Sequence, residues 1–302
     1  MITAGFDRCA LLLRRALVLG LAACLAACAT VRIGYEFGDT LVFAWADGYL
    51  DFDSRQQAFA KAKLQAWLDW HRHSELPAYV ALIGEAQSAV ATEVTATDIL
   101  GFEMRVRARL RETVEREAAD LSRLALMLSA AQIDRLERKL AEGTEKARRD
   151  RAAEERPLET RTARYVKRLE PWLGDVRAEQ RVELKAMLAV RPSNWEGAFL
   201  ARQRSQAELV RLLRRIQTTR PDLSVVRDAL LAWMSQVADP IDPANPARSQ
   251  QTRTEVGEML ARMLNSADAE QRATLAKRLS GYAEDFRVLV ARATPRQGLL
   301  TQ

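Results

Sequence analysis

Cysteine is scarce in this chain of 302 residues, which has three, all within its first 28 residues. The remainder therefore has no cysteine pair for a disulfide, and its fold must rest on a hydrophobic core. Histidine is scarcer still, with only His71 and His73. Two positions apart on a helix, their side chains point about 200° away from each other, so they cannot jointly hold one metal ion.

Motifs of common catalytic sites are also missing. The sequence has no cysteine–histidine metal spacing, glycine-rich phosphate loop, nucleophile elbow or His-Glu-x-x-His pattern. We therefore expect a protein that is not an enzyme, with no metal and no cofactor other than a covalent lipid. His71 is expected to pack or to form a hydrogen bond rather than to catalyse.

Charge of one sign is not clustered. Lysine and arginine number 46, aspartate and glutamate number 40, and the net charge is +6. Acidic and basic residues are mixed along the chain, whereas a nucleic-acid surface needs a clustered basic stripe, so no nucleic acid is expected as a partner. The small basic excess suits a protein attached to an anionic lipid surface.

The N-terminus has the features of a secretory signal. Arg14-Arg15 precedes an apolar stretch that ends at Ala27 and is too short to span a bilayer. Its last residues, Leu25-Ala26-Ala27-Cys28, resemble the lipobox of bacterial lipoproteins. The resemblance implies a signal peptide over 1–27, cleavage before Cys28 and acylation of Cys28. No later run has transmembrane length, so the expected membrane anchor is this lipid alone.

Two alternatives to lipidation at Cys28 stay open. Leu21-Ala22-Ala23-Cys24 fits the same pattern, although cleavage there would shorten the apolar region and leave Cys28 as a free thiol. The segment could also be a plain secretory signal with incidental cysteines. Residue 29 is Ala rather than Asp. By resemblance to lipoproteins of Gram-negative bacteria, this favours the outer membrane, and we expect the protein there, facing the periplasm.

Helical periodicity dominates the rest of the chain. Apolar residues recur at helical spacing and β-branched alternation is nearly absent, so we predict an all-α, elongated fold of about ten helices in stacked antiparallel hairpins. A lipidated tether over 28–38 would lead into a single helical domain over 39–294. A proline-rich loop over 239–248 would interrupt this domain, and a loose tail would follow over 295–302.

Several helix boundaries can be predicted from capping residues. Asp53 and Gln56 have the spacing of a capping box at the start of a helix whose apolar stripe runs from Phe59 to Trp70. Thr95 or Thr97 is expected to cap a long helix. Residues 141–156 hold no apolar residue except alanine and read as an exposed helical arm or as a disordered charged linker.

One type of helix start recurs. Gln followed by x3-Leu-x3-Leu begins at Gln132, Gln180 and Gln271, with steps of 48 and 91 residues, and a weaker fourth match begins at Val226. Such a period suggests stacked helical hairpins. Ser129 and Asp268 complete capping boxes with the glutamines three residues later, whereas the second start lacks a capping side chain or borrows Asp175.

This helix start resembles a known signature. Leu128-Ser-Ala-Ala-Gln132 is similar to the Leu-Thr-x-x-Gln motif that the Spy/CpxP family of periplasmic helical chaperones and stress sensors carries twice. The resemblance implies chaperone-like binding of envelope proteins.

A more extensive resemblance covers nearly the whole chain after the lipobox. Its residues are Tyr35, Asp39, Trp45-Ala-Asp47-Gly-Tyr49, Asp51-Phe52-Asp53, Trp70-His71-Arg72 and Leu76-Pro77-Ala-Tyr79. Their order and spacing resemble a family of uncharacterised proteobacterial lipoproteins, known as a domain of unknown function. This resemblance implies no activity.

The segment over 33–54 is acidic and aromatic and has no lysine or arginine. It could bind a basic partner or a cation, or its aspartates could cap helices and pair with buried donors. The candidate partner-binding residues are Tyr35, Trp45, Asp47, Tyr49, Asp51 and His71.

Two functions follow as expectations. The first is a lipid-anchored periplasmic binding protein of the outer membrane with chaperone-like binding of envelope clients. The alternative is a scaffold that docks a fixed envelope partner through the aromatic segment 35–53. A chaperone should expose a wide apolar and basic concavity, whereas a scaffold should show one compact aromatic patch.

Overall fold

The computed structural model describes residues 31–32, 34–155, 157–191, 195–238 and 244–293. Within them the chain forms eleven α-helices and one π-helical turn, with no strand, which confirms the all-α prediction. The elements are α2 (Gly38–Leu50), α3 (Ser54–Trp70), η1 (His71–Glu75), α4 (Leu76–Ala89), α5 (Ala96–Met127), α6 (Ala130–Glu155), α7 (Leu158–Leu173), α8 (Ala178–Ala189), α9 (Trp195–Thr219), α10 (Leu223–Ala238), α11 (Pro246–Asn265) and α12 (Ala269–Ala293). The predicted signal peptide, Cys24, Cys28 and the tail over 295–302 lie outside the described residues.

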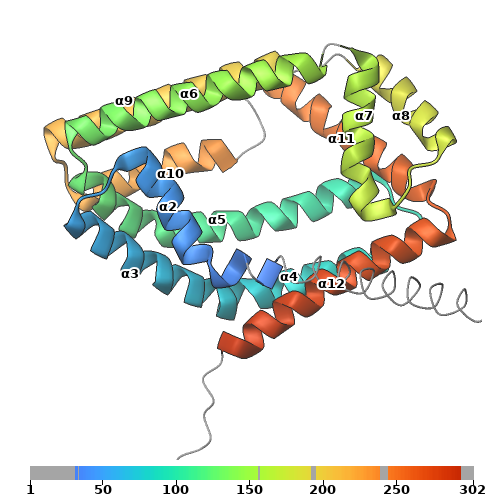
Figure 1. Cartoon of the computed structure of the whole chain (residues 1–302), viewed down its shortest axis with the longest axis horizontal. Helices are drawn as coiled ribbons and strands as arrows, with labels where there is room; N and C mark the ends of the chain where they lie inside the picture. Colours follow the sequence, from blue (N-terminus) through green and yellow to red (C-terminus); the bar gives the residue numbers. More distant parts are fainter. Residues whose placement is uncertain (1–30, 33, 156, 192–194, 239–243, 294–302) are drawn as a thin grey trace, which may run out of the picture.

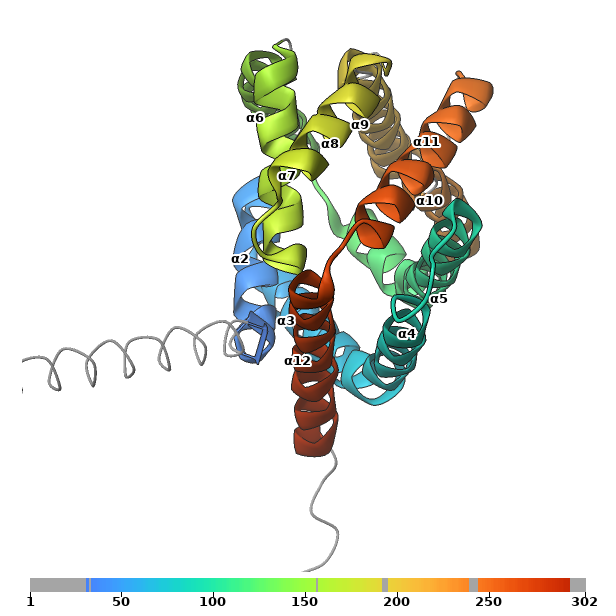
Figure 2. The same ribbon diagram turned by 90° about the vertical axis from the view of Figure 1, so that its right-hand side faces the viewer.

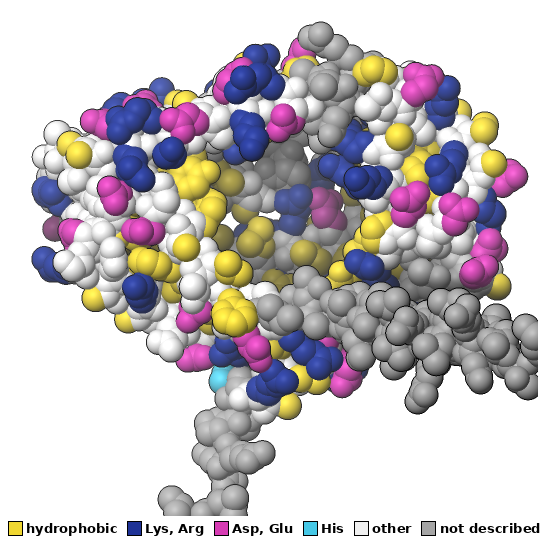
Figure 3. All heavy atoms as spheres, in the orientation of Figure 1, with side chains coloured by type: hydrophobic (Ala, Val, Ile, Leu, Met, Phe, Trp, Pro, Cys, Tyr) yellow, Lys and Arg dark blue, Asp and Glu magenta, His cyan; other side chains and the backbone are white. Residues whose placement is uncertain are grey.

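The helices are arranged as a frame (Figure 1), and the space-filling view shows a hollow inside it (Figure 3). Helix α6 packs on α9 and α7, α12 packs on α7 and α4, and α2 packs on α3 and α6. Seen from the side, α2 and α6 form one wall, and α5, α10 and α11 form the opposite one (Figure 2). Consecutive helices such as α7 and α8 do contact each other, but extensive interfaces also join elements far apart in sequence, such as α4 with α12 and α5 with α10.

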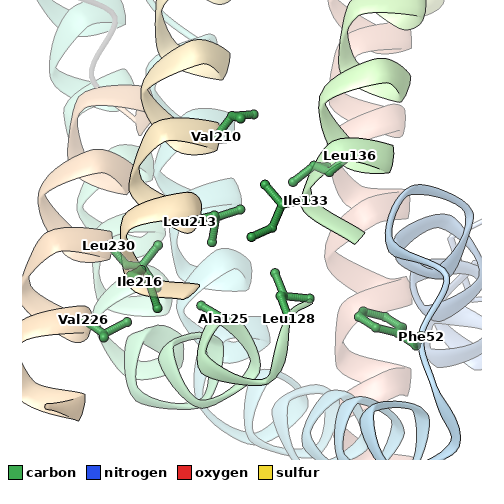
Figure 4. Close-up of a cluster of buried hydrophobic side chains, with 10 residues drawn as sticks. All are labelled: Phe52, Ala125, Leu128, Ile133, Leu136, Val210, Leu213, Ile216, Val226 and Leu230. Carbon is green, nitrogen blue, oxygen red and sulfur yellow. The ribbon is translucent and has the colours of Figure 1, made fainter. Parts of the chain in front are cut away.

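The largest hydrophobic cluster lies where α5, α6, α9 and α10 meet (Figure 4). The cluster contains residues from the ends of helices and residues from the apolar faces of long helices. Burial of these side chains therefore stabilises both the helix ends and the packing of the helices on each other. Its buried members are Phe52, Ala125, Leu128, Ile133, Leu136, Val210, Leu213, Ile216, Val226 and Leu230.

Two smaller clusters support the other end of the molecule. One is formed by α7, α8 and α11 with a residue of the loop between α7 and α8, and its members are Val166, Val176, Leu184, Leu188, Met259 and Met263. The other joins the end of α7 to the start of α12 through Leu173, Ala267 and Leu275. The hollow therefore lies inside a frame whose ends have separate hydrophobic cores.

Predicted capping residues set several helix boundaries. The Thr95 hydroxyl accepts a hydrogen bond from the Asp98 amide at 3.2 Å, and α5 runs 32 residues from there to Met127. Asp53 accepts from the Gln56 amide at 2.8 Å, which confirms the predicted start of α3. The proline-rich loop is shorter than predicted, because the Asn245 side chain caps α11 and Pro246 is its first residue.

The charged segment over 141–156 is helical up to Glu155, but the expectation of an exposed arm is wrong at Thr144. The Thr144 side chain is only 2% exposed, and its hydroxyl hydrogen-bonds the Gln206 side chain of α9 at 3.0 Å. A small polar side chain lets two charged helices approach closely, so α6 packs on α9 without an apolar residue at this position.

Part of the predicted tether packs against the helical frame. Arg32 forms an ion pair with the buried Asp285 of α12 at 2.6 Å, and Glu36 pairs with Arg292 at the end of α12 at 2.6 Å. Charge pairing with α12 therefore begins four residues after Cys28.

Candidate functional site

A pocket lies between α2 and α6 at the edge of the hollow. It has a volume of about 460 Å³ and is lined by Ala44, Trp45, Gly48, Tyr49, Lys139, Glu142, Gly143 and Lys146. The Trp45 indole is 67% exposed and its ring centroid lies 5.1 Å from that of Tyr49. Figure 3 shows the hollowed face, with hydrophobic side chains gathered on two of its sides and lysine and arginine side chains around it.

The chemistry of the pocket suits binding. Lys139 pairs with Glu142 at 3.0 Å, and Lys146 adds a second ammonium group, so the lining carries an excess of positive charge. A Cβ atom at Gly48 would meet no atom within 4 Å, which means that this glycine leaves the pocket open. The lining has no histidine, cysteine or serine that could act as a nucleophile or base. It offers an aromatic wall beside ammonium groups.

Two predicted partner-binding residues, Asp47 and Asp51, shape the end of α2 and do not line the pocket. The Asp47 carboxylate accepts a hydrogen bond from the Phe52 amide at 2.9 Å. Asp51 adopts a left-handed conformation with φ of 53°, and its backbone carbonyl accepts from Gln132 at 3.0 Å. These contacts turn the chain from α2 into α3 and fit the interpretation in which the aspartates have structural roles.

Tyr35 and His71 lie together at a second place, the π-helical turn η1. The His71 ring lies between 5.1 and 6.3 Å, centroid to centroid, from four aromatic rings, and its Nδ1 atom shares a hydrogen bond with the Tyr35 hydroxyl. Those rings belong to Tyr35, Trp67, Trp70 and Tyr79. A π turn inserts one extra residue per turn and changes which side chains share a face. His71 therefore points into an aromatic cluster while His73 is exposed.

Burial sets the protonation of this aromatic cluster. It lowers the pKa of His71, although the Glu75 carboxylate acts in the opposite direction. It also raises the pKa of Tyr35. At neutral pH a neutral imidazole and a protonated phenol can therefore share one hydrogen bond without a half-buried charge.

Glu75 is a buried carboxylate in the same turn. It is 0% exposed, and Arg109 of α5 donates to its two oxygens at 3.0 and 2.5 Å. Arg109 also reaches Glu112 at 2.8 Å. The bidentate pair satisfies the buried charge and joins η1 to α5, which is a structural role.

The helix-start glutamines form two reciprocal pairs. Gln56 and Gln132 donate to each other's side-chain oxygens at 3.0 and 2.6 Å. Gln180 and Gln271 do the same at 2.9 Å in both directions. Partners are 76 and 91 residues apart in sequence, so each pair joins two distant helix starts.

Each of these four amides satisfies all of its hydrogen-bonding groups by the same pattern. The oxygen also accepts from the backbone amide of its own N-cap residue, at 2.9 to 3.3 Å. The second N–H donates to a backbone carbonyl two residues before the partner's N-cap. Those carbonyls belong to Asp51, Met127, Asp175 and Ser266. The predicted residues Ser129, Gln132, Gln180, Asp268 and Gln271 are thus structural.

The fourth helix start of this type lies at Asp53 and Gln56, not at the predicted match beginning at Val226. Val226 and Leu230 are buried apolar residues inside α10. The second start lacks a capping carboxylate as predicted, but Asp175 contributes its backbone carbonyl to Gln271 instead of a cap. The sequence does contain the pattern that identifies the start at Asp53. In all four helix starts an apolar residue precedes the N-cap residue, and Gln follows the N-cap residue by three positions.

Comparison with known proteins identifies the family. The family model described as "Family of unknown function (DUF6279)" matches residues 48–236. The chain belongs to this family. The match covers three of the four paired glutamines, all except Gln271. No curated protein and no solved structure matches the chain.

The described residues show neither a metal-binding cluster nor a membrane-spanning helix. Among them, no group of three or more histidine, cysteine, aspartate or glutamate side chains could hold a metal ion. None of the described helices is both long and apolar enough to cross a bilayer. Of the predicted partner-binding residues, only Trp45 and Tyr49 line the pocket, while the rest support α2 or the aromatic cluster at η1.

Proposed function

We propose that this protein is a lipid-anchored, chaperone-like binding protein of the outer membrane that faces the periplasm. The observation that carries the proposal is the pocket between α2 and α6, with the exposed Trp45, at the edge of a hollowed face. The lipobox resemblance supports the anchor, and the Spy/CpxP-like helix starts support client binding.

The chemistry of the pocket indicates what a client would present. Trp45 and Tyr49 offer aromatic surface to an apolar side chain, and Lys139 and Lys146 attract a neighbouring carboxylate. Unfolded or partly folded envelope proteins expose such apolar segments. The hollow beside the pocket gives the remaining part of a segment room to lie against the wall.

A pocket-filling substitution tests client binding. Gly48→Leu would place a side chain at the pocket, where the first added atom, Cβ, meets nothing within 4 Å. Gly84→Leu is the matched control, since Gly84 is also helical and has the same open space in α4. We expect the parent and Gly84→Leu to slow aggregation of a heat-denatured client at near-stoichiometric ratio without nucleotide, and Gly48→Leu to slow it less.

Light scattering at low and high salt provides the measurement. Protection should weaken at high salt for an acidic client, because the lysine contribution is screened. If aggregation in low salt proceeds unchanged at a few-fold molar excess of the parent protein, client binding of this kind is excluded.

A scaffold is the second candidate, and the exposed apolar residues of α2 favour it. Phe37, Leu41, Val42 and Trp45 form one compact set near the N-terminus. Crosslinking in intact cells distinguishes the two functions. A scaffold should yield one dominant crosslinked protein, whereas a chaperone should yield many.

The anchor has its own test. Metabolic labelling with a palmitate analogue should mark the parent and Cys24→Ala but not Cys28→Ala. Loss of label only in Cys24→Ala would move the lipid to the alternative cysteine.

A further inference from the structure

The exposed side of α2 carries no charged residue. The exposed residues of α2 and its N-cap are Phe37, Thr40, Leu41, Val42, Ala44, Trp45 and Gly48. Ala44, Trp45 and Gly48 line the pocket with α6, so we call the remaining four residues, Phe37, Thr40, Leu41 and Val42, the charge-free face. The side chain of Leu41 is 59% exposed and that of Phe37 is 56% exposed. Charged residues make up 28% of the chain, so a helix face without any of them is unusual in this protein.

The two charged residues of α2, Asp39 and Asp47, are half-buried and accept hydrogen bonds from backbone amides. The Asp39 carboxylate accepts from the amide of Thr40 at 2.7 Å, and Asp47 closes the helix end through the Phe52 amide at 2.9 Å. Helix α2 packs on α3, where Leu68 lies 3.6 Å from the position of a Cβ atom at Gly38. Helix α2 also packs on α6 beside the pocket, whereas its charge-free face is exposed.

The position of α2 relative to Cys28 indicates what covers the charge-free face. Val31 is three residues after Cys28, a distance of at most about 11 Å even in a fully extended chain. Arg32 is paired with the buried Asp285 at 2.6 Å, and Tyr35 is hydrogen-bonded to His71, so this segment is fixed on the frame. A lipid on Cys28 would therefore hold the start of α2 next to the bilayer.

We propose that the charge-free face of α2 lies in the interfacial region of the membrane to which Cys28 is attached. Leucine, valine and phenylalanine side chains suit this region, where the apolar side of an amphipathic helix lies parallel to the surface. The inference rests on the proposed lipid anchor.

The absence of charge on this face makes the proposal specific. Peripheral helices that bind through lysine and arginine need anionic lipids and release at high salt. Contact through the charge-free face depends on burial of apolar area, so it should occur on uncharged lipid surfaces and survive high salt. A protein partner is the competing occupant of the same face.

The test uses residues 28–302 with Cys28→Ser, which retain every residue described here but cannot be acylated. Binding is measured by co-sedimentation with vesicles of phosphatidylcholine alone and of phosphatidylcholine with phosphatidylglycerol, at low and high salt. Leu41→Glu places a charge on the face, and Val182→Glu is the control, because Val182 is 69% exposed on the distant helix α8. Circular dichroism checks that both variants stay folded.

We expect the parent and Val182→Glu to bind both vesicle types with little effect of salt. Leu41→Glu should lower the partition coefficient about tenfold or more, because a carboxylate would enter the apolar interface. The proposal is overturned by no binding of the parent, by binding only to anionic vesicles at low salt, or by unchanged binding of Leu41→Glu. It is also overturned if a photo-crosslinker at position 41 in intact cells captures protein and no lipid.

The vesicle experiment contains no client and the aggregation experiment contains no membrane. Failure of membrane contact therefore leaves client binding standing, and failure of client protection leaves membrane contact standing.

Discussion

At the scale of single residues, the glutamine at the third position of four helices explains how segments distant in sequence are held together. A glutamine there closes its own helix start and also pairs with the glutamine of a second helix start. Gln56, Gln180 and Gln271 are buried, and each side-chain group in these pairs has a partner. Buried amides that satisfy one another in this way specify one mutual arrangement of the two helices.

Removal of one member of a glutamine pair should be costly. Gln180→Ala would leave one N–H of the buried Gln271 amide and the Arg177 backbone N–H without their acceptor, and we expect a loss of about 2–4 kcal/mol in the free energy of unfolding. The double variant with Gln271→Ala should lose less than the sum of the single losses. Urea unfolding gives the values, with the exposed Gln203→Ala as control. Additive losses would mean that the two amides do not interact in solution.

His71 should make stability depend on pH. In the unfolded chain its pKa is near 6.5, and burial lowers the pKa in the folded protein. As pH falls below about 6.5 the unfolded chain binds a proton that the folded chain does not, so the free energy of unfolding falls. The contribution of the neutral imidazole is complete above this pH and is lost progressively below it.

Urea midpoints measured at pH values from about 7.5 down to 5 test this dependence. We expect His71→Phe to flatten the decline relative to the parent, and His73→Gln, which changes an exposed histidine, to preserve it. An equal decline in all three proteins would assign the pH dependence to other groups.

Sequence predicted residue roles where the signal is local and failed where the partner is distant. The boxes at Asp53 and Ser129 depend on residues three positions apart, and both were predicted. The pairing of Gln56 with Gln132 spans 76 residues, and nothing in either helix start specifies its partner. Two of the predicted binding residues line the pocket, whereas Lys139 and Lys146 were missed because only folding brings α6 beside α2.

At the scale of elements, α3, η1 and α4 form one continuous helical path from Ser54 to Ala89 with a π turn inside it. The predicted apolar stripe from Phe59 to Trp70 is wrong in its middle, where Ala62 and Ala66 are exposed although α3 is regular there and the π turn begins only at His71. Trp67 and Trp70 are only half-buried, and Arg116 lies 4.6 Å from the Trp70 ring centroid. The π turn is a shift in the backbone hydrogen-bond register, and apolar periodicity does not report such a shift, so the sequence could not predict the turn.

Leu68, which the predicted stripe omitted, should carry much of the stability of α3. Its side chain is 6% exposed and packs beneath α2 beside Gly38. Leu68→Ala should lower the free energy of unfolding by about 2–5 kcal/mol, the range for a buried leucine. Leu200→Ala, at a half-exposed position in α9, should stay within about 0.5 kcal/mol of the parent. Chemical denaturation followed by circular dichroism compares them, and equal stability of the two variants would contradict this packing.

At the scale of the whole molecule, the hollow frame separates the hydrophobic residues into three clusters. Helix α5 links the two ends. Ala125, near its C-terminus, belongs to the largest cluster, while at its other end a Cβ atom at Gly257 of α11 would lie 3.4 Å from the Ala96 carbonyl oxygen. The frame and its hollow result from contacts between helices distant in sequence, so periodicity predicted the fold class and elongated form but not the enclosed space.

A frame held by such shared helices should unfold as one unit. Leu213→Ala removes a side chain from the largest cluster, and Leu184→Ala removes one from the α7, α8 and α11 cluster. Because α5 packs on both α10 and α11, loss of either cluster should release the same long helix. We therefore expect both variants to lower the midpoint of one thermal transition, followed by far-UV circular dichroism and by tryptophan fluorescence. Two transitions, each shifted by only one variant, would instead divide residues 39–294 into independently folding parts and limit any coupling between the pocket at α2 and the distant end of the frame.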